Sequence, residues 1–229
     1  MTTKTPAVAP PPPVRGRVAR RRAAVRQRVL ENAERLMETH GVEAVTIDDI
    51  TDAADIARRS FYYHFESKHD VLVPIARART KGLNRRIDRL VASMDDPAEM
   101  VATGIRHALR RISGDPLCRW FVLRSGLPHD RLAEGLGESG TRDIRRGIES
   151  GRFRVTNARV VQTLLLGSMI AVLGARADGT LRDGDFDDAA DHALRLLGVP
   201  VNEAHAIAHD RLRPLPPDPG PADHGEETR

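Results

Sequence analysis

Apolar residues recur at helical spacing along most of the chain. From about residue 20 to 39, Val25, Val29, Ala33 and Met37 form a stripe that repeats every four residues, which is the spacing of one face of an α-helix. The same reasoning predicts further helices at 47–54, 57–63, 67 to about 90, 97–113, 116–124, 128–150, 157–177, 185–198 and 200–211. Valine and isoleucine seldom alternate with polar residues, so the pattern favours an all-α fold.

Residues that typically begin helices stand between these segments. Proline fits the first helical position because its missing N–H has no intrahelical partner there, and four prolines fall at such starts: Pro97, Pro116, Pro128 and Pro200. Thr46 and Asp49 are three residues apart and predict a capping box. The chain should therefore consist of helices joined by short turns.

The distribution of proline predicts the domain boundaries. Five of the fifteen prolines lie in residues 1–13 and another five in 214–221. Both ends are also poor in large apolar side chains, which predicts a disordered basic, proline-rich arm over 1–19 and a disordered tail over 213–229. Between them we expect a small domain of short helices over 20–66 and a larger helical domain over 67–212.

Positive charge is concentrated at the N-terminal end. The net charge is +4 and the isoelectric point about 9.8, yet Lys4 and seven arginines lie within residues 1–30, which contain no acidic residue. Such asymmetry is typical of a segment that binds a polyanion, although a solvated tail without a partner has the same composition.

Aromatic residues are rare but clustered. The chain has eight, and four of them lie in positions 61–65 beside two arginines and a histidine. Phe61 and Phe65 are four residues apart and should share a buried face, while Tyr62, Tyr63 and His64 face other ways. Their hydroxyl and ring N–H groups can bind phosphate oxygens or base edges.

Two short helices held between two longer ones form the helix-turn-helix plan. The segment "RVLENAERLMETHGVEAVTIDDITDAADIARRSFYYHFESKHDVL", within residues 24–75, resembles the DNA-binding region of the TetR family of bacterial transcriptional repressors. Its "FYYHFESKHDVL" part is similar to the family's recognition-helix signature. The resemblance implies a three-helix DNA-binding domain followed by a larger helical domain for ligand binding and dimerisation.

The resemblance and the side-chain chemistry together imply a set of DNA contacts. Phosphate contacts fall to Thr46, Tyr62, His64 and Lys68, and base contacts to Arg58, Arg59, Ser60 and Tyr63. A flexible arm ahead of the first helix can enter a minor groove, which adds Arg15, Arg17, Arg20, Arg21 and Arg22.

The sequence departs from the family pattern in the turn before the recognition helix. Asp55 stands where glycine is common, and aspartate tolerates a left-handed turn better than most residues. Ala57 replaces a serine, so Asp55 is also a candidate cap for the next helix. Arg59 replaces a glycine and adds a bidentate donor, the commonest reader of guanine.

Membership of this family would imply a repressor that binds a palindromic operator as a homodimer and is released by a small molecule. The apolar segments 158–175 and 186–197 are the candidate dimer helices. The candidate ligand-binding residues are Arg106, His107, Cys118, Trp120, Phe121 and Phe153. A non-specific architectural DNA-binding protein, or less favourably an activator, remains the alternative.

Other classes of protein find little support in the sequence. There is no glycine-rich phosphate loop and no catalytic constellation, so we expect neither enzymatic activity nor a cofactor. His205 and His209 are four residues apart, a geometry that can bind metal, but no third ligand is evident and we expect no metal site.

Residues 160–175 are interrupted by polar side chains and read as a buried helix rather than a membrane span. We expect a cytoplasmic protein.

Overall fold

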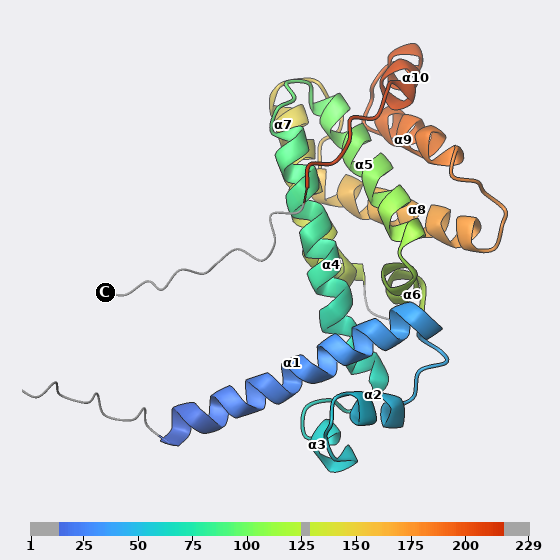
Figure 1. Ribbon diagram of the computed structural model, residues 1–229. Coiled ribbons are helices and arrows are strands. Elements are labelled where there is room, and N and C mark those ends of the chain that lie inside the picture. Colours follow the sequence, from blue (N-terminus) through green and yellow to red (C-terminus); the bar gives the residue numbers. More distant parts are fainter. Residues whose placement is uncertain (1–13, 125–128, 218–229) are drawn as a thin grey trace, which may run out of the picture. The chain divides into compact units, whose positions relative to one another are not determined.

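The computed structural model describes residues 14–124 and 129–217 and divides the chain into two compact units, residues 1–72 and 73–229. In the described residues the chain forms ten α-helices and no strands (Figure 1), which confirms the all-α fold. The predicted boundary after residue 66 lies six residues before the observed one. The difference arises because the first residues of the fourth helix pack in the smaller unit.

The smaller unit contains α1 (Val14–His40), α2 (Ile47–Ala53), α3 (Arg58–Tyr62) and the start of α4 (Lys68–Val91). The C-terminal half of α1 lies along α2, which in turn contacts α3 (Figure 1). The apolar stripe predicted for α1 faces the core of this unit, since Val29, Ala33 and Met37 are fully buried. They share the core with Ile50 and Phe61.

The first helix begins at Val14, earlier than the predicted start near residue 20. Arginine and alanine are good helix formers, and Gly16 lies in the first turn, where its cost is small. Residues 14–19 of the segment predicted as a disordered arm are thus helical. Residues 1–13, and the Arg15 side chain, lie outside the described part of the chain.

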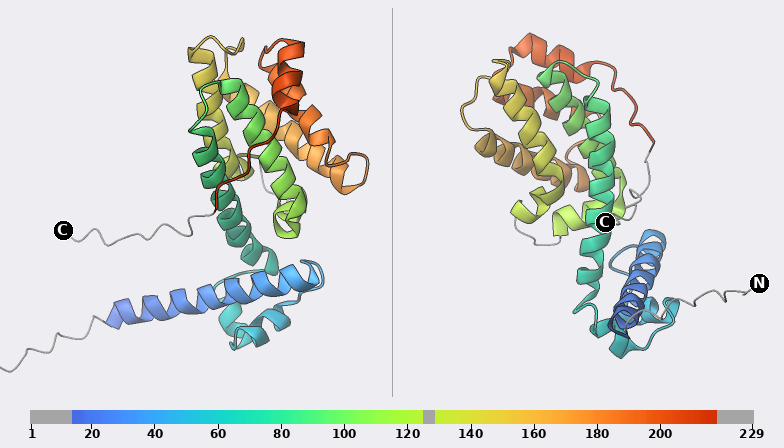
Figure 2. Two further views of the ribbon diagram at one scale, coloured as in Figure 1. Left: turned by 45° about the horizontal axis from the view of Figure 1, so that its top comes forward. Right: turned by 90° about the vertical axis from the view of Figure 1, so that its left-hand side faces the viewer.

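The larger unit is built around α5 (Pro97–Gly114), which contacts α6 (Pro116–Arg124), α7 (His129–Glu149), α8 (Ala158–Ala177), α9 (Asp185–Leu196) and α10 (Val201–His209) (Figure 2). Thirteen of the eighteen residues of α5 are buried. Asp96 caps this helix by accepting a hydrogen bond from the Ala98 N–H at 2.9 Å, with Pro97 in the first turn, as the sequence predicts. The predicted start at Pro128 falls outside the described residues, and Pro200 caps α10 instead of opening it.

The chain after α10 is held against the larger unit. Residues 210–217 run back towards α4 (Figure 1), and the Arg86 side chain donates a hydrogen bond to the Pro216 carbonyl at 2.7 Å. Leu215 packs on the core. Residues 213–217 of the predicted tail are therefore ordered, because prolines that lack N–H donors still offer carbonyls to arginine.

Helix α8 differs from the buried helix that the sequence suggested. By length and composition it could cross a membrane, with a mean hydropathy of 1.6, although one such helix is weak grounds for a span. Only 22% of that apolar window is buried in the chain. Val160 and Leu164 are more than half exposed, so this helix presents an apolar face that the single chain does not cover.

Candidate nucleic-acid interface and internal cavity

Helix α3 presents basic and aromatic side chains over a buried aromatic pair. Phe61 and Phe65 are 0% and 5% exposed, with ring centroids 5.7 Å apart. Between them, Tyr62 and Tyr63 are 47% and 61% exposed. Successive helical residues point about 100° apart, so the two phenylalanines anchor the helix while the tyrosines and arginines face outward. This confirms the packing predicted for the aromatic cluster.

The turn into α3 has the backbone that its sequence predicts. Asp55 has a φ of 49°, the only left-handed non-glycine residue in the described chain. Asp55 therefore takes the conformation expected where glycine is common. The capping role suggested for it is wrong, since Ala57 is the N-cap and makes no side-chain capping bond.

Arg58 is engaged by a neighbouring carboxylate. Its guanidinium contacts both oxygens of Asp48 on α2, at 2.5 and 2.7 Å, and lies 3.4 Å from the Tyr62 hydroxyl. Those contacts, first with Tyr62 and then with Asp48, raise the pKa of Arg58. Both charged side chains are mostly exposed, so a phosphate or base could compete with Asp48 for the guanidinium. Arg59 is exposed and Ser60 half-buried on the same helix.

Thr46 forms the predicted capping box at the start of α2. Its hydroxyl accepts from the Asp49 N–H at 3.1 Å and donates to an Asp49 carboxylate oxygen at 2.6 Å. The same carboxylate accepts from the Thr46 N–H at 2.8 Å. The hydroxyl hydrogen bond from Thr46 is the main cause of the lowered pKa of Asp49. The exposed threonine therefore has a clear capping role, and a phosphate contact would have to displace Asp49.

Lys68 lies at the start of α4, but its ammonium is already bound by backbone carbonyls. Its ammonium donates to the carbonyls of Val42, Glu43 and Val45 at 3.0, 3.0 and 3.1 Å. A lysine has three N–H donors, so all of them tie α4 to the turn between α1 and α2. The phosphate role expected for Lys68 does not fit this geometry.

The basic residues of α1 extend towards α3. Arg17, Arg20, Arg21 and Arg22 are exposed, and the Arg22 guanidinium lies 4.9 Å from the Tyr63 ring centroid. One turn later, Arg26 stacks on Phe65 at 5.1 Å. Burial, followed by the charges of Arg26 and Arg22, lowers the pKa of His64. Arg26 was not among the predicted DNA-binding residues, although its four-residue spacing from Arg22 places both arginines on one helix face.

The larger unit encloses a cavity of about 80 Å³ lined by α4, α5, α7 and α8. Most of the wall is apolar, with Ile87, Ile105 and Met169 among its residues. Polar groups enter it from Asn84, Asp88, Ser139, Asp143 and Gln162. An apolar cavity with a few polar groups is typical of a small-molecule site.

Some of the polar groups at the cavity are joined by hydrogen bonds, and one buried donor is unpaired. Asp88 accepts from Ser139 Oγ at 2.9 Å and from Arg142 at 3.0 Å. Asp143 is buried, and that burial raises its pKa despite the neighbouring Arg142. The buried Asn84 Nδ2 has no hydrogen-bond partner among the described residues. A buried donor left unpaired is costly, so Asn84 is suited to a ligand that supplies an acceptor.

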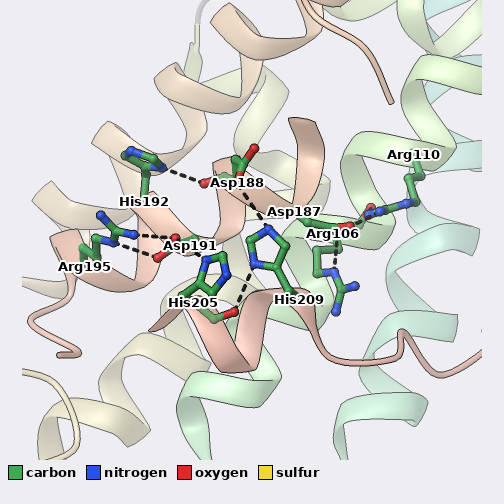
Figure 3. Close-up of polar contacts among 9 residues, drawn as sticks. All are labelled: Arg106, Arg110, Asp187, Asp188, Asp191, His192, Arg195, His205 and His209. Atoms are coloured by element: carbon green, nitrogen blue, oxygen red, sulfur yellow. Dashed lines mark hydrogen bonds and ion pairs between the residues drawn. The ribbon is translucent and has the colours of Figure 1, made fainter. Parts of the chain in front are cut away.

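None of the six residues predicted to bind the ligand lines this cavity. Arg106 pairs with Asp187 at 2.6 Å (Figure 3). It also donates to the Asp210 carbonyl, and His107 Nε2 lies 3.0 Å from the Arg213 carbonyl. These two residues hold the chain that follows α10. Their selection rested on polarity within a helix that turned out to be buried on several sides.

The other four of the six are buried or half-buried side chains of the larger unit. Burial raises the pKa of the Cys118 thiol to about 12, and this residue borders a separate, more polar cavity of about 180 Å³ beside Arg79 and Arg111. Phe121 and Phe153 are buried and Trp120 is half-buried. The observed cavity residues could have been sought as polar positions on apolar faces, such as Asn84 and Asp88 four residues apart beside Ile87.

Comparisons with known proteins give a match to the N-terminal helices, which include α3, and a second match to the C-terminal helices, which form most of the cavity wall. The profile for bacterial regulatory proteins of the tetR family matches residues 29–74, and that for a tetracyclin repressor-like C-terminal domain matches residues 96–210. The solved structure of RolR with the ligand resorcinol is 31% identical, with a TM-score of 0.79, covering 86% of this chain and 98% of that one.

Two curated relatives carry similar names. An uncharacterized HTH-type transcriptional regulator of Mycobacterium tuberculosis is 30% identical over 45% of this chain and 52% of its own length. The HTH-type transcriptional repressor KstR of Mycolicibacterium smegmatis is 24% identical over 75% of this chain and 86% of its own. The chain thus spans about half the length of the first of these.

The N-terminal match covers the α3 surface and the C-terminal match covers most of the cavity wall, and together they make this chain a member of the TetR family of DNA-binding transcriptional regulators.

Proposed function

We propose that this regulator is a cytoplasmic repressor that binds a palindromic operator as a homodimer and is released by a small hydroxylated aromatic molecule. The observation that supports DNA reading is the outward face of α3, where Arg58, Arg59, Tyr62 and Tyr63 stand over a rigid pair of buried phenylalanines. A rigid helix with exposed donors can read base edges in a major groove. The exposed arginines of α1 would add phosphate or minor-groove contacts.

Selection from a random DNA pool with the full-length protein tests the DNA-binding part. The proposal predicts an inverted repeat with half-sites about one helical turn apart, since the recognition helices of a dimer lie roughly 34–36 Å apart. A variant with Arg58 and Arg59 both changed to alanine should lose the motif. Recovery of no enriched motif by the unaltered protein would favour the architectural alternative.

The homodimer is supported by the exposed apolar face of α8. Val160, Leu164 and Ala171 are exposed along one side of this helix, and Leu196 of α9 is 47% exposed. Between α8 and α9 lies an apolar groove of about 330 Å³. A second copy can fill such a groove with its own α8 side chains, because a two-fold interface pairs the same surface with itself.

Sedimentation velocity of Leu164→Glu tests this interface. A carboxylate buried between two chains is strongly unfavourable, so the variant should sediment as a monomer where the unaltered chain sediments as a dimer. Val201→Glu is the matched control, since Val201 is 56% exposed on α10, outside the α8 and α9 stripe. A Leu164→Glu dimer as stable as the control would contradict the proposed interface.

The ligand class follows from the cavity chemistry and from the resorcinol bound by RolR. Asp88 and Asp143 can accept hydrogen bonds from ligand hydroxyls, and Asn84 Nδ2 can donate one. A cavity that holds benzene measures about 150 Å³, so the 80 Å³ space must expand on binding. Met100 and Met169 line it and are flexible enough to repack. The ligand causes release of DNA only if it binds the protein with the expanded cavity more tightly than the protein in its DNA-binding conformation.

Calorimetric titration with resorcinol as the probe tests this part independently of DNA. Saturable binding by the unaltered protein, weakened in Asn84→Ala and Asp143→Asn, would support the proposal. Asn202→Ala changes an exposed asparagine on α10 and should bind as the unaltered protein does. Equal affinity in all four proteins would exclude the cavity as the binding site.

A further inference from the structure

Three groups able to bind a metal ion converge where α9 meets α10. Asp191 comes from α9, and His205 and His209 from successive turns of α10 (Figure 3). One ligating atom from each residue lies within 4.8 Å of the others. Sequence alone offers the two histidines at the i and i+4 spacing of metal-binding helices. The fold supplies the third group from a position fourteen residues earlier.

Hydrogen bonds orient the imidazoles towards this point. His209 Nδ1 lies 3.0 Å from the His205 carbonyl, to which it can only donate. The Nε2 lone pair of neutral His209 then faces outward, 3.2 Å from a carboxylate oxygen of Asp188. Metal-ligating histidines commonly donate their other ring N–H to a carbonyl in this way. His205 Nδ1 in turn lies 3.4 Å from Asp191 Oδ2.

The cluster brings imidazole nitrogens and carboxylate oxygens together, and these atoms are ligands for a cation. His209 Nε2 and a carboxylate oxygen of Asp188 lie 3.2 Å apart, and the rings of His205 and His209 have a centroid separation of 4.1 Å. A shared divalent cation can bind the lone pairs of neutral imidazoles and of carboxylates together. Arg195 contacts both oxygens of Asp191 at 2.7 and 2.6 Å, so it orients this buried ligand while leaving lone pairs on Oδ2.

We propose that Asp191, His205 and His209, with Asp188 as the fourth ligand, bind a divalent transition-metal cation of the zinc, cobalt or nickel class. Two imidazoles with carboxylate oxygens suit these borderline ions. In a tetrahedral site with bonds of about 2.0–2.1 Å the donor atoms lie roughly 3.4 Å apart. The donor atoms of Asp191, His205 and His209, which lie within 4.8 Å of one another, must therefore close by up to about 1.4 Å. Asp188, already 3.2 Å from His209 Nε2, must approach the other two ligands, and the largely exposed His205 and Asp188 side chains allow both movements. The bound cation would tie α10 to α9.

Titration of the untagged, chelator-treated full-length protein with Zn²⁺ tests the site. Binding of one cation per chain is expected, together with a rise in melting temperature, because a ligand that binds only the folded state stabilises it. Co²⁺ should give the visible absorption of a low-symmetry site. His205→Ala and His209→Ala should each weaken Zn²⁺ binding by about ten-fold or more, on the scale of losses at metal sites.

His192→Ala is the matched control. His192 is exposed on α9, and its Nδ1 lies 2.8 Å from the Asp188 carbonyl, but it is outside the group of three. Binding should be retained in this variant. The absence of saturable Zn²⁺ binding, affinity unchanged in both alanine variants of α10, or an equal loss in His192→Ala would each overturn the proposal. Both substitutions are at exposed side chains of α10, and buried Asp191 keeps its two contacts with Arg195, so both variants should fold.

Discussion

At the scale of single residues, Arg59 is the side chain that most sharply distinguishes DNA reading from simple surface charge. It is exposed on α3, and it forms no ion pair within the described part of the chain, in contrast to Arg58 with Asp48. Arg59→Ala should weaken operator binding by about 1–3 kcal/mol and relax selection at one base position. Arg35→Ala removes the same charge from an exposed site on α1 and should leave the selected motif unchanged. Equal losses of affinity in both variants would contradict a base contact.

His107 should give the protein a pH-dependent stability near neutrality. Burial lowers the pKa of His107, and the charges of Arg110, Arg106 and Arg86 lower it further, against the hydrogen bond with the Arg213 carbonyl. The unfolded chain gains a proton at about pH 6.5, whereas the folded chain does so only at lower pH. Stability should therefore fall as pH drops below about 6.5, until the folded pKa is passed.

Melting temperatures between pH 7.5 and 5.0 measure this effect. His107→Gln keeps a donor for the Arg213 carbonyl but cannot titrate, so its melting temperature should fall less on acidification. Carboxylates with a lowered pKa, such as Asp96 and Asp115, lose their contribution to stability in a separate pH range, below about pH 4. His40→Gln, at an exposed site on α1, serves as the control. Identical acid sensitivity in all three proteins would exclude His107 as the cause.

At the scale of elements, Lys68 links α4 to the turn between α1 and α2. Lys68→Met should lower the free energy of unfolding by about 1.5–3 kcal/mol, the range for hydrogen bonds to a charged group. Lys81→Met, at an exposed position on α4, should change it little. Urea unfolding measures both. If Lys68 touched DNA instead, its removal would reduce the salt dependence of binding while leaving the unfolding curve in place.

Helices were predicted well where local signals were strong. The Thr46 and Asp49 pair and the Asp96 cap with Pro97 fix their helix starts by hydrogen bonds within three residues, so sequence was sufficient. The start of α1 at Val14 was missed because proline-rich composition suggested disorder up to residue 19. Residues 213–217 were expected to be disordered because their order depends on arginines more than a hundred positions away.

The candidate sites divide in the same way. The outward tyrosines of α3 follow from the spacing of Phe61 and Phe65, which is a local property. The cavity draws Asn84, Asp143 and Gln162 from three helices, and the cation site draws Asp191 to a pair of histidines on another helix. Both the cavity and the cation site form through packing between segments that are distant in the sequence. A single sequence does not show which distant residues come together.

At the scale of the whole molecule, charge should control affinity for any DNA. The exposed arginines of α1 lie in the smaller unit beside α3, so Arg20→Ala combined with Arg21→Ala should reduce the slope of log affinity against log salt by about 0.9 for each phosphate that the protein no longer neutralises. Arg182→Ala combined with Arg211→Ala removes the same charge from the larger unit, where Arg211 is exposed. Its slope should match that of the unaltered protein, and equal slopes for both double variants would exclude binding of phosphates through α1.

We propose that α3 reads DNA sequence, and the ratio of two affinities tests this most directly. The selected inverted repeat and a scrambled duplex of the same length and composition would be titrated with full-length protein at one salt concentration. Specific regulators bind their sites about a thousand-fold or more tightly than other DNA, and we expect such a ratio here, reduced in Arg59→Ala. A ratio near one would contradict it and identify a protein that coats DNA through charge alone.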